Sequence, residues 1–166
     1  MSIEAVKEYL RPFGVADRVQ EFDVSSATVE LAAQAVGVEP ARIAKTISLK
    51  ADEGCVLVVA AGDAKIDNSK FKAEFHMKAK MLSADEVLPL TGYPVGGVCP
   101  FGNPDTAKVY CDESLHRFAT VFPACGTANS AIELSCEELE RCSHSLKWVN
   151  VCKNWEAGGT QHADAQ

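Results

Sequence analysis

The chain has 166 residues and a formal net charge of −7, and this length fits one domain with a core of ordinary size. The acidic balance argues against indiscriminate binding to polyanions, so we expect no DNA partner. No apolar run reaches the roughly 18 residues of a membrane helix, and the charged amino terminus is unlike a signal peptide. We therefore expect a cytoplasmic protein that does not bind membranes.

The first fifty residues are predicted to alternate helices with strands. Ile3, Val6 and Leu10 recur at helical spacing, which favours an opening amphipathic helix. The predicted elements are a helix over 3–13, a strand over 18–24, a helix over 28–37 with N-cap oxygens at Ser25 and Ser26, a helical turn over 40–45 and a strand over 46–50. Lys45 then falls at a junction, where its side chain either reaches a cleft or lies on the surface.

The rest of the chain continues this irregular alternation. The predicted elements are a buried strand over 55–62, a helix from about Asp67, a short helix after the capping box at 83–86, strands over 107–114, 118–126 and 131–135, a helix over 135–142 after a second capping box, and a strand over 146–152. About six strands and five helices predict a mixed α/β fold, with a mixed six-stranded sheet or open barrel and flanking helices. We expect one domain over 1–152 and a flexible tail over 153–166.

The seven cysteines are odd in number, and several lie in apolar runs. This is typical of reduced thiols used as small core residues. Cys136, Cys142 and His144 come nearest to a metal-binding cluster, but their spacing is irregular. Neither a P-loop nor a G-x-G-x-x-G motif occurs. We expect no metal and no cofactor.

Three further places in the sequence have candidate chemistry. The loop YPVGGVCPFG, 93–102, either forms a simple bend or leaves backbone N–H groups free to bind an anion. Its Cys99 is either a nucleophile or a small pocket-wall residue. The segment ACGTANSAIEL, 124–134, either contributes hydrogen bonds to a pocket or forms a turn.

A basic segment interrupts the acidic chain. Between residues 65 and 80 it contains the lysines Lys65, Lys70, Lys72, Lys78 and Lys80. These side chains form either a solvated helix face or a local surface for nucleic acid.

Three segments in a fixed order resemble a known family. ATVELAAQAVGVEPARIAK, TGYPVGGVCPFG and FPACGTANSAIELS are similar to the YbaK/prolyl-tRNA-synthetase-associated domain family of trans-editing aminoacyl-tRNA deacylases. The resemblance extends from about Val19 to about Leu139. It implies a YbaK-like fold and hydrolysis of the ester that joins a wrong amino acid to the terminal adenosine of a tRNA. The implied partners are aminoacyl-tRNA, with tRNA-Pro favoured, and as a further option prolyl-tRNA synthetase.

The resemblance also implies catalytic residues. Lys45 matches the family's essential lysine, and Gly96 and Pro100 match the ends of its G-x-x-x-P loop. We expect the N–H groups of Gly96 and Gly97 to hold the reacting carbonyl or its oxyanion, with Lys45 fixing the terminal nucleotide. A lysine of ordinary pKa is a poor base, so the proton acceptor is a water, the ribose 2′-hydroxyl or, in a cysteinyl ester, the substrate thiol.

The expected substrate pocket selects by size. Phe22 stands at a position where related proteins have an aromatic or other pocket residue. Cys99 stands where related proteins more often have serine or threonine. Ala131 stands where one branch of the family has an acidic residue. The pocket residues are Phe22, Val98, Cys99, Pro100, Asn129, Ser130 and Ala131, and the five lysines become candidate tRNA contacts. Alanine, cysteine and serine are all small enough to be removed.

Two alternatives to a lysine-dependent deacylase remain at this point. The first is a non-catalytic module of the same fold that binds a tRNA or a synthetase. The second is a cysteine-dependent hydrolase or redox protein that uses Cys99.

Overall fold

A computed structural model of the chain describes residues 2–155. The α-helices among these residues are α1 (Ile3–Leu10), α2 (Val29–Val36), α3 (Asn68–Phe75), α4 (Ala84–Thr91) and α5 (Cys136–Ser143). Four short 3-10 helices accompany them, namely η1 (Arg11–Phe13), η2 (Ala16–Arg18), η3 (Pro40–Arg42) and η4 (Glu113–Arg117). No helix in the described range is long and apolar enough to span a membrane.

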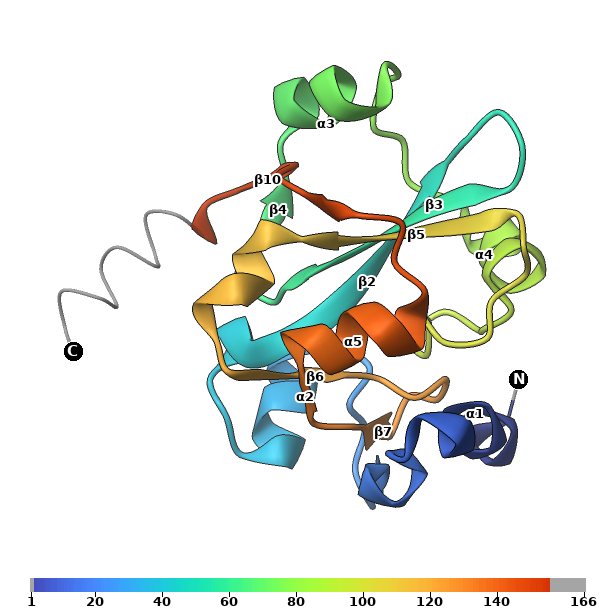
Figure 1. Cartoon of the computed structure of the whole chain (residues 1–166), viewed down its shortest axis with the longest axis vertical. Coiled ribbons are helices and arrows are strands. Elements are labelled where there is room, and N and C mark those ends of the chain that lie inside the picture. The colour runs from blue at the N-terminus through green and yellow to red at the C-terminus, as the bar shows by residue number, and fades with distance from the viewer. Residues whose placement is uncertain (1, 156–166) are drawn as a thin grey trace, which may run out of the picture.

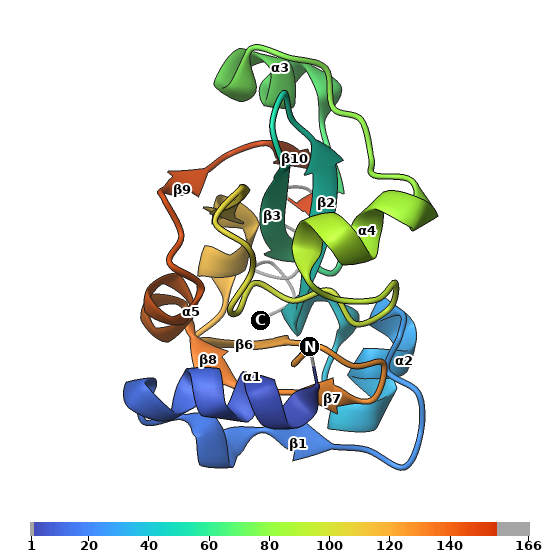
Figure 2. The same ribbon diagram turned by 90° about the vertical axis from the view of Figure 1, so that its right-hand side faces the viewer.

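Six strands form one mixed sheet. In order across the sheet they are β8 (Leu134–Ser135), β6 (Thr120–Pro123), β2 (Ile43–Lys50), β3 (Cys55–Ala61), β5 (Ala107–Asp112) and β9 (Trp148–Val149). β2 and β3 pair as an antiparallel hairpin, whereas β2–β6, β3–β5 and β5–β9 are parallel pairs. Both views place α3 at the top of the molecule and α1 and α2 in its lower half (Figures 1 and 2). The predicted mixed fold and six-stranded sheet are confirmed.

The buried strand β3 is the centre of the core. All seven of its residues are buried, because β2 and β5 cover its two edges and side chains from other elements cover both faces. A strand buried on both faces is expected to be a continuous apolar run, and CVLVVAA is one. The hydrophobic pattern alone therefore identified this element.

Several predicted strands are shorter in the structure. The strand expected over 18–24 is only β1 (Gln20–Glu21), which pairs with β7 (Ser130–Ala131) in a separate two-stranded sheet. The run 146–152 splits between β9 and β10 (Cys152–Lys153), and β10 pairs with β4 (Lys65–Ile66). These pairs join residues more than 80 positions apart, so local sequence pattern does not reveal them.

The helix starts predicted from capping boxes were more accurate than the predicted strand bounds. Both predicted capping boxes form, at the starts of α4 and α5. The prediction for α2 was wrong in detail, because Thr28 is its N-cap and accepts a hydrogen bond from the Leu31 N–H at 3.2 Å. Ser26 is instead buried beside the cavity described below.

The expected tail over 153–166 lies almost entirely outside the described residues. Of its residues, Lys153 ends β10, and Trp155 is the last one described. The Trp155 indole N–H donates to the carbonyl oxygen of Cys152 at 3.2 Å.

Candidate active site

A cavity of about 190 Å³ lies where four distant segments meet. Its walls are the loop before α2 with the start of that helix, the first residues of β2, the turn around 96–98, and the segment 122–131. Of the predicted site residues, the lining contains Lys45, Gly96, Val98, Ser130 and Ala131. The lining does not contain Phe22, Gly97, Cys99, Pro100 or Asn129.

Lys45 lies within β2 and not at the junction predicted for it. The strand begins at Ile43, and Lys45 pairs with Ala60 of β3. Its Nζ donates to the carbonyl oxygen of Gly62 at 3.2 Å and to that of Ala64. An ammonium has three donors, so one N–H has no acceptor among residues 2–155.

The surroundings of this lysine also affect its pKa. Burial is the largest effect and lowers the pKa of Lys45, while the charge of Asp63 is among the effects that oppose it. The result is a half-buried amine at the cavity edge, held by two carbonyl groups and not by a carboxylate.

The glycine-rich loop forms a tight turn at the cavity. The Gly97 N–H donates to the carbonyl oxygen of Pro94 at 3.0 Å, and Gly96 has a φ of 90°, the positive value that a type II turn needs at its third residue. A Cβ on Gly97 would lie 2.7 Å from the Gly126 carbonyl oxygen. Gly96 and Val98 both line the cavity, and their N–H groups have no acceptor in the described part of the chain. Gly97 thus provides close packing, and its N–H is already engaged.

Cys99 lies in the core and has no exposed surface. Burial raises the pKa of its thiol to about 12, so almost none of it is thiolate at neutral pH. The carbonyl oxygen of Cys99 accepts a hydrogen bond from the Asn103 side chain at 3.0 Å. This environment is that of an inert core residue and does not suit a cysteine nucleophile.

We predict that Cys99 resists alkylation in the folded protein. Native protein treated with iodoacetamide and analysed by mass spectrometry should be modified at the half-buried Cys136 at least about 100-fold faster than at Cys99, since the thiolate reacts and Cys99 is covered. Denaturant should abolish this difference. Rapid modification of Cys99 in the native state would instead support the cysteine-dependent alternative.

The cysteines are small core residues, as the sequence predicted. All seven are free thiols, and six of them are buried. The Cys136 thiol donates to the carbonyl oxygen of Leu115 at 3.4 Å, while His144 ends α5 in the left-handed conformation and packs against Tyr9 and Phe13. Among residues 2–155, no three His, Cys, Asp or Glu side chains are grouped to hold a metal ion.

Phe22 and Asn129 hold two walls of the cavity together. The Phe22 N–H donates to the Asn129 carbonyl oxygen at 2.8 Å, and the Asn129 side-chain amide donates to the Phe22 carbonyl oxygen at 3.1 Å. The Ser26 N–H donates to the carbonyl oxygen of Ala128 at 2.6 Å. Asn129 therefore fixes the loop that precedes α2, and its side chain is exposed outside the lining.

Ser26 and Thr46 are among the lining residues that were not predicted as site residues from the sequence. Their hydroxyl oxygens are buried and have no hydrogen-bond partner among the described residues. A buried hydroxyl without a partner costs about 1–3 kcal/mol, and the large majority of buried side-chain polar atoms in proteins have a partner. Thr46 follows Lys45 directly, which was the one signal in the sequence that pointed to it.

The five lysines do not act as one group. Lys65, Lys72, Lys78 and Lys80 are exposed, whereas the Lys70 ammonium donates to the carbonyl oxygen of Cys152 at 3.1 Å. Lys72 lies on α3, which both views place far from α2 (Figures 1 and 2). Lys65 is the one whose charge affects the pKa of Lys45, which it lowers.

Comparison with protein families gives one match over most of the chain. The family described as the aminoacyl-tRNA editing domain matches residues 23–142. This range contains every lining residue of the cavity.

Individual relatives agree with this match. The uncharacterized protein YwhH of Bacillus subtilis is 52% identical over 157 residues, which cover 94% of this chain and 100% of that protein. EbsC of Enterococcus faecalis, named as a proposed Cys-tRNA(Pro)/Cys-tRNA(Cys) deacylase, is 29% identical over 68% of this chain and 70% of its own length. A proline–tRNA ligase of Thermotoga maritima is 36% identical over 78 residues, and the match spans only 13% of that enzyme.

A solved structure has the same fold. It is described as a proposed trans-editing enzyme for prolyl tRNA synthetase. The two structures superpose with a TM-score of 0.82 at 27% identity, over 93% of this chain and 99% of the other.

Proposed function

The chain belongs to the aminoacyl-tRNA editing domain family, and from that premise we propose that it hydrolyses the ester between a small amino acid and a mischarged tRNA. The proposal rests on one observation, that Lys45 and the Gly96 N–H, which has no acceptor among residues 2–155, lie at the same small cavity. The name of EbsC supports cysteine on tRNA-Pro as a substrate to test, and the name of the trans-editing enzyme supports a tRNA of prolyl-tRNA synthetase. Alanine and serine are of similar size and are tested beside cysteine.

The proposed reaction needs little from the protein beyond positioning and charge stabilisation. A water attacks the ester carbonyl, the bond from this carbon to the ribose oxygen breaks, and the ribose oxygen takes up a proton. The products are a free amino acid and a tRNA with a free terminal hydroxyl. An aminoacyl ester is already activated, so a well-placed donor for the oxyanion accounts for much of the acceleration.

Backbone N–H groups and one ammonium at the cavity carry the proposed catalysis. The Gly96 N–H would bind the developing oxyanion, and the Val98 N–H is a second candidate donor, since both lack an acceptor among residues 2–155. The ammonium of Lys45 would hold the terminal nucleotide with its remaining N–H. The proton leaves through a bound water, the ribose 2′-hydroxyl or a substrate thiol.

The small side chains of the lining would act as the size filter. Ala27, Ala124 and Ala131 line the cavity together with Val98. One additional methylene in an apolar pocket changes binding by about 1–3 kcal/mol. The filter would therefore reject larger amino acids, including the proline of correctly charged tRNA-Pro.

The tRNA body would contact the basic surface outside the cavity. Lys65, Lys72, Lys78 and Lys80 are exposed and suited to phosphate contacts. Lys70 contributes less in this proposal, because its ammonium is hydrogen-bonded to Cys152. A synthetase partner would not be required for this contact.

The proposal predicts turnover on a defined set of substrates. Purified protein is incubated with alanyl, cysteinyl and seryl esters of tRNA-Pro, and release of the amino acid is followed against the spontaneous rate. We expect at least one ester to be cleaved about 100-fold or more above that rate. Prolyl-tRNA-Pro is the control and should remain intact. No turnover on any of the three esters would favour the non-catalytic binding module.

A further inference from the structure

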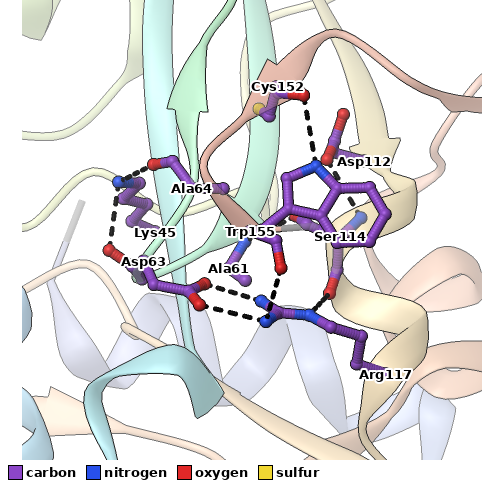
Figure 3. A network of polar contacts seen from close by, with 10 residues as sticks. Lys45, Ala61, Asp63, Ala64, Asp112, Ser114, Arg117, Cys152 and Trp155 are labelled. Carbon is purple, nitrogen blue, oxygen red and sulfur yellow. Dashed lines mark hydrogen bonds and ion pairs between the residues drawn. The ribbon is translucent and has the colours of Figure 1, made fainter. Parts of the chain in front are cut away.

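The turn that holds Lys45 is itself fixed by an ion pair. Both carbonyl groups that accept from Lys45 lie in the turn after β3, where the Ala64 N–H donates to the Ala61 carbonyl oxygen at 3.0 Å. Asp63 is at the tip of this turn and faces Arg117 (Figure 3). The position of the Lys45 ammonium therefore depends on the conformation of the four-residue turn 61–64.

The contact between Asp63 and Arg117 is bidentate. Arg117 Nη2 donates to Asp63 Oδ1 at 2.6 Å, and Arg117 Nη1 donates to Asp63 Oδ2 at 3.0 Å. The side chain of Arg117 is only 15% exposed, and that of Asp63 is only 28% exposed. Paired and shielded contacts of this geometry are stronger and more directional than surface ion pairs.

The guanidinium is held rigidly on its other sides. Its Nε donates to the carbonyl oxygen of Ser114 at 2.9 Å, and its Nη1 also donates to that of Trp155 at 3.3 Å. Its Cζ lies 4.9 Å from the ring centroid of Phe118 and 5.4 Å from that of Trp155. Arg117 is thus a fixed support, and not a flexible surface side chain.

A second set of hydrogen bonds joins η4 to the same turn. Ser114 Oγ accepts from the Ala61 N–H at 3.1 Å, at the end of β3. Asp112, which is fully buried, accepts from the Ser114 N–H at 3.0 Å and from the Val151 N–H at 2.9 Å. The turn is therefore tied to η4 at both its start and its tip, as Figure 3 shows.

We propose that Asp63 and Arg117 are positioning residues for Lys45, and that their ion pair fixes the turn whose carbonyl groups hold the ammonium at the cavity. This inference rests on the role proposed above for Lys45. Arg117 also occupies both carboxylate oxygens of Asp63, which keeps that carboxylate from drawing the ammonium away. Neither residue lines the cavity, so both act through the lysine.

The test is a double-mutant cycle on deacylation. Arg117→Met should lower kcat/KM by about 10- to 100-fold, since a displacement of about 1 Å in a positioning group can cost this much. In a Lys45→Met background the same change should have no further effect. A general loss of structure would lower both rates by the same factor. Arg18→Met is the matched control, because Arg18 pairs with Glu138 at 2.9 Å away from the cavity, and it should leave the rate within about twofold.

A spectroscopic measurement separates this inference from the proposed function. NMR signals of the Lys45 side chain, in protein with labelled lysine, should shift in Arg117→Met and not in Arg18→Met. Asp63→Asn, which keeps the side-chain shape, should shift them too and replaces Arg117→Met if that variant does not fold. Unmoved Lys45 signals together with an unchanged rate would overturn the inference while leaving the deacylase proposal intact. Shifted signals with equal rates for Lys45→Met and wild type would support the positioning and overturn the catalytic role of the lysine.

Discussion

Lys45→Met should lower kcat/KM for the ester that the wild type cleaves by about 100-fold, because the terminal nucleotide loses its proposed contact with the ammonium and a misplacement of the ester by about 1 Å can cost this much. Methionine keeps most of the length of the side chain and removes its charge. The carbonyl oxygens of Gly62 and Ala64 lose their donor in this variant. The measurement is single-turnover release of the amino acid, which separates the chemical step from product release.

The control for this variant is another lysine of the same strand. Lys50 also lies on β2, and its ammonium is 3.3 Å from the Glu86 carboxylate outside the cavity. Lys50→Met should retain the wild-type rate within about twofold, because surface ion pairs contribute little. Equal rates for the wild type and Lys45→Met would contradict the proposed role of Lys45.

Gly62→Ala should reduce both stability and activity. A Cβ at Gly62 would lie 2.1 Å from the carbonyl oxygen of Pro40 and 2.7 Å from Val29 Cγ1. Because one contact is with backbone, the turn must move, and we expect the free energy of unfolding to fall by roughly 1–3 kcal/mol. Urea denaturation followed by circular dichroism measures this loss. The same movement displaces a carbonyl group that holds Lys45.

Gly54→Ala is the control that separates a loss of activity at the site from a general loss of stability. A Cβ at Gly54 would lie 2.1 Å from the Thr106 carbonyl oxygen, and Gly54 has a φ of 71°. Gly54 lies between β2 and β3, away from the cavity lining. Gly54→Ala should therefore lose comparable stability but keep its rate per folded molecule, whereas Gly62→Ala should lose at least about tenfold in rate. The same rate loss in both variants would mean that the Gly62 effect is only global.

Elements that depend on residues close together in the sequence formed as predicted, whereas strand pairs between distant residues were not predicted. The capping boxes at 83–86 and 135–138 depend on residues three positions apart, and both form. The apolar run at 55–61 is long enough to require burial on both faces, and it is the central strand. The strand predicted over 18–24 was too long. Only Gln20 and Glu21 pair with β7, which lies about 110 positions away in the sequence.

Some of the residues that the resemblance placed in the candidate site lie together in the structure, while their roles stay predictions. The resemblance identified Lys45, Gly96 and Ala131, and all three line one cavity. It also suggested Cys99, which follows Val98 directly in the loop but is buried in the core. Neighbouring residues in an irregular loop can face opposite sides, and no periodicity tells which one faces the cavity.

By itself the sequence determined the family, the mixed fold with its main helices and the buried strand that begins at Cys55, and it pointed to Lys45 as the residue to test. Only the tertiary structure decided which N–H groups are free, which thiols are buried, and which turn holds the lysine. The physical reason is separation along the chain. Asp63 and Arg117 are 54 residues apart, and their contact depends on how strands pair and how loops pack, which short-range patterns do not encode.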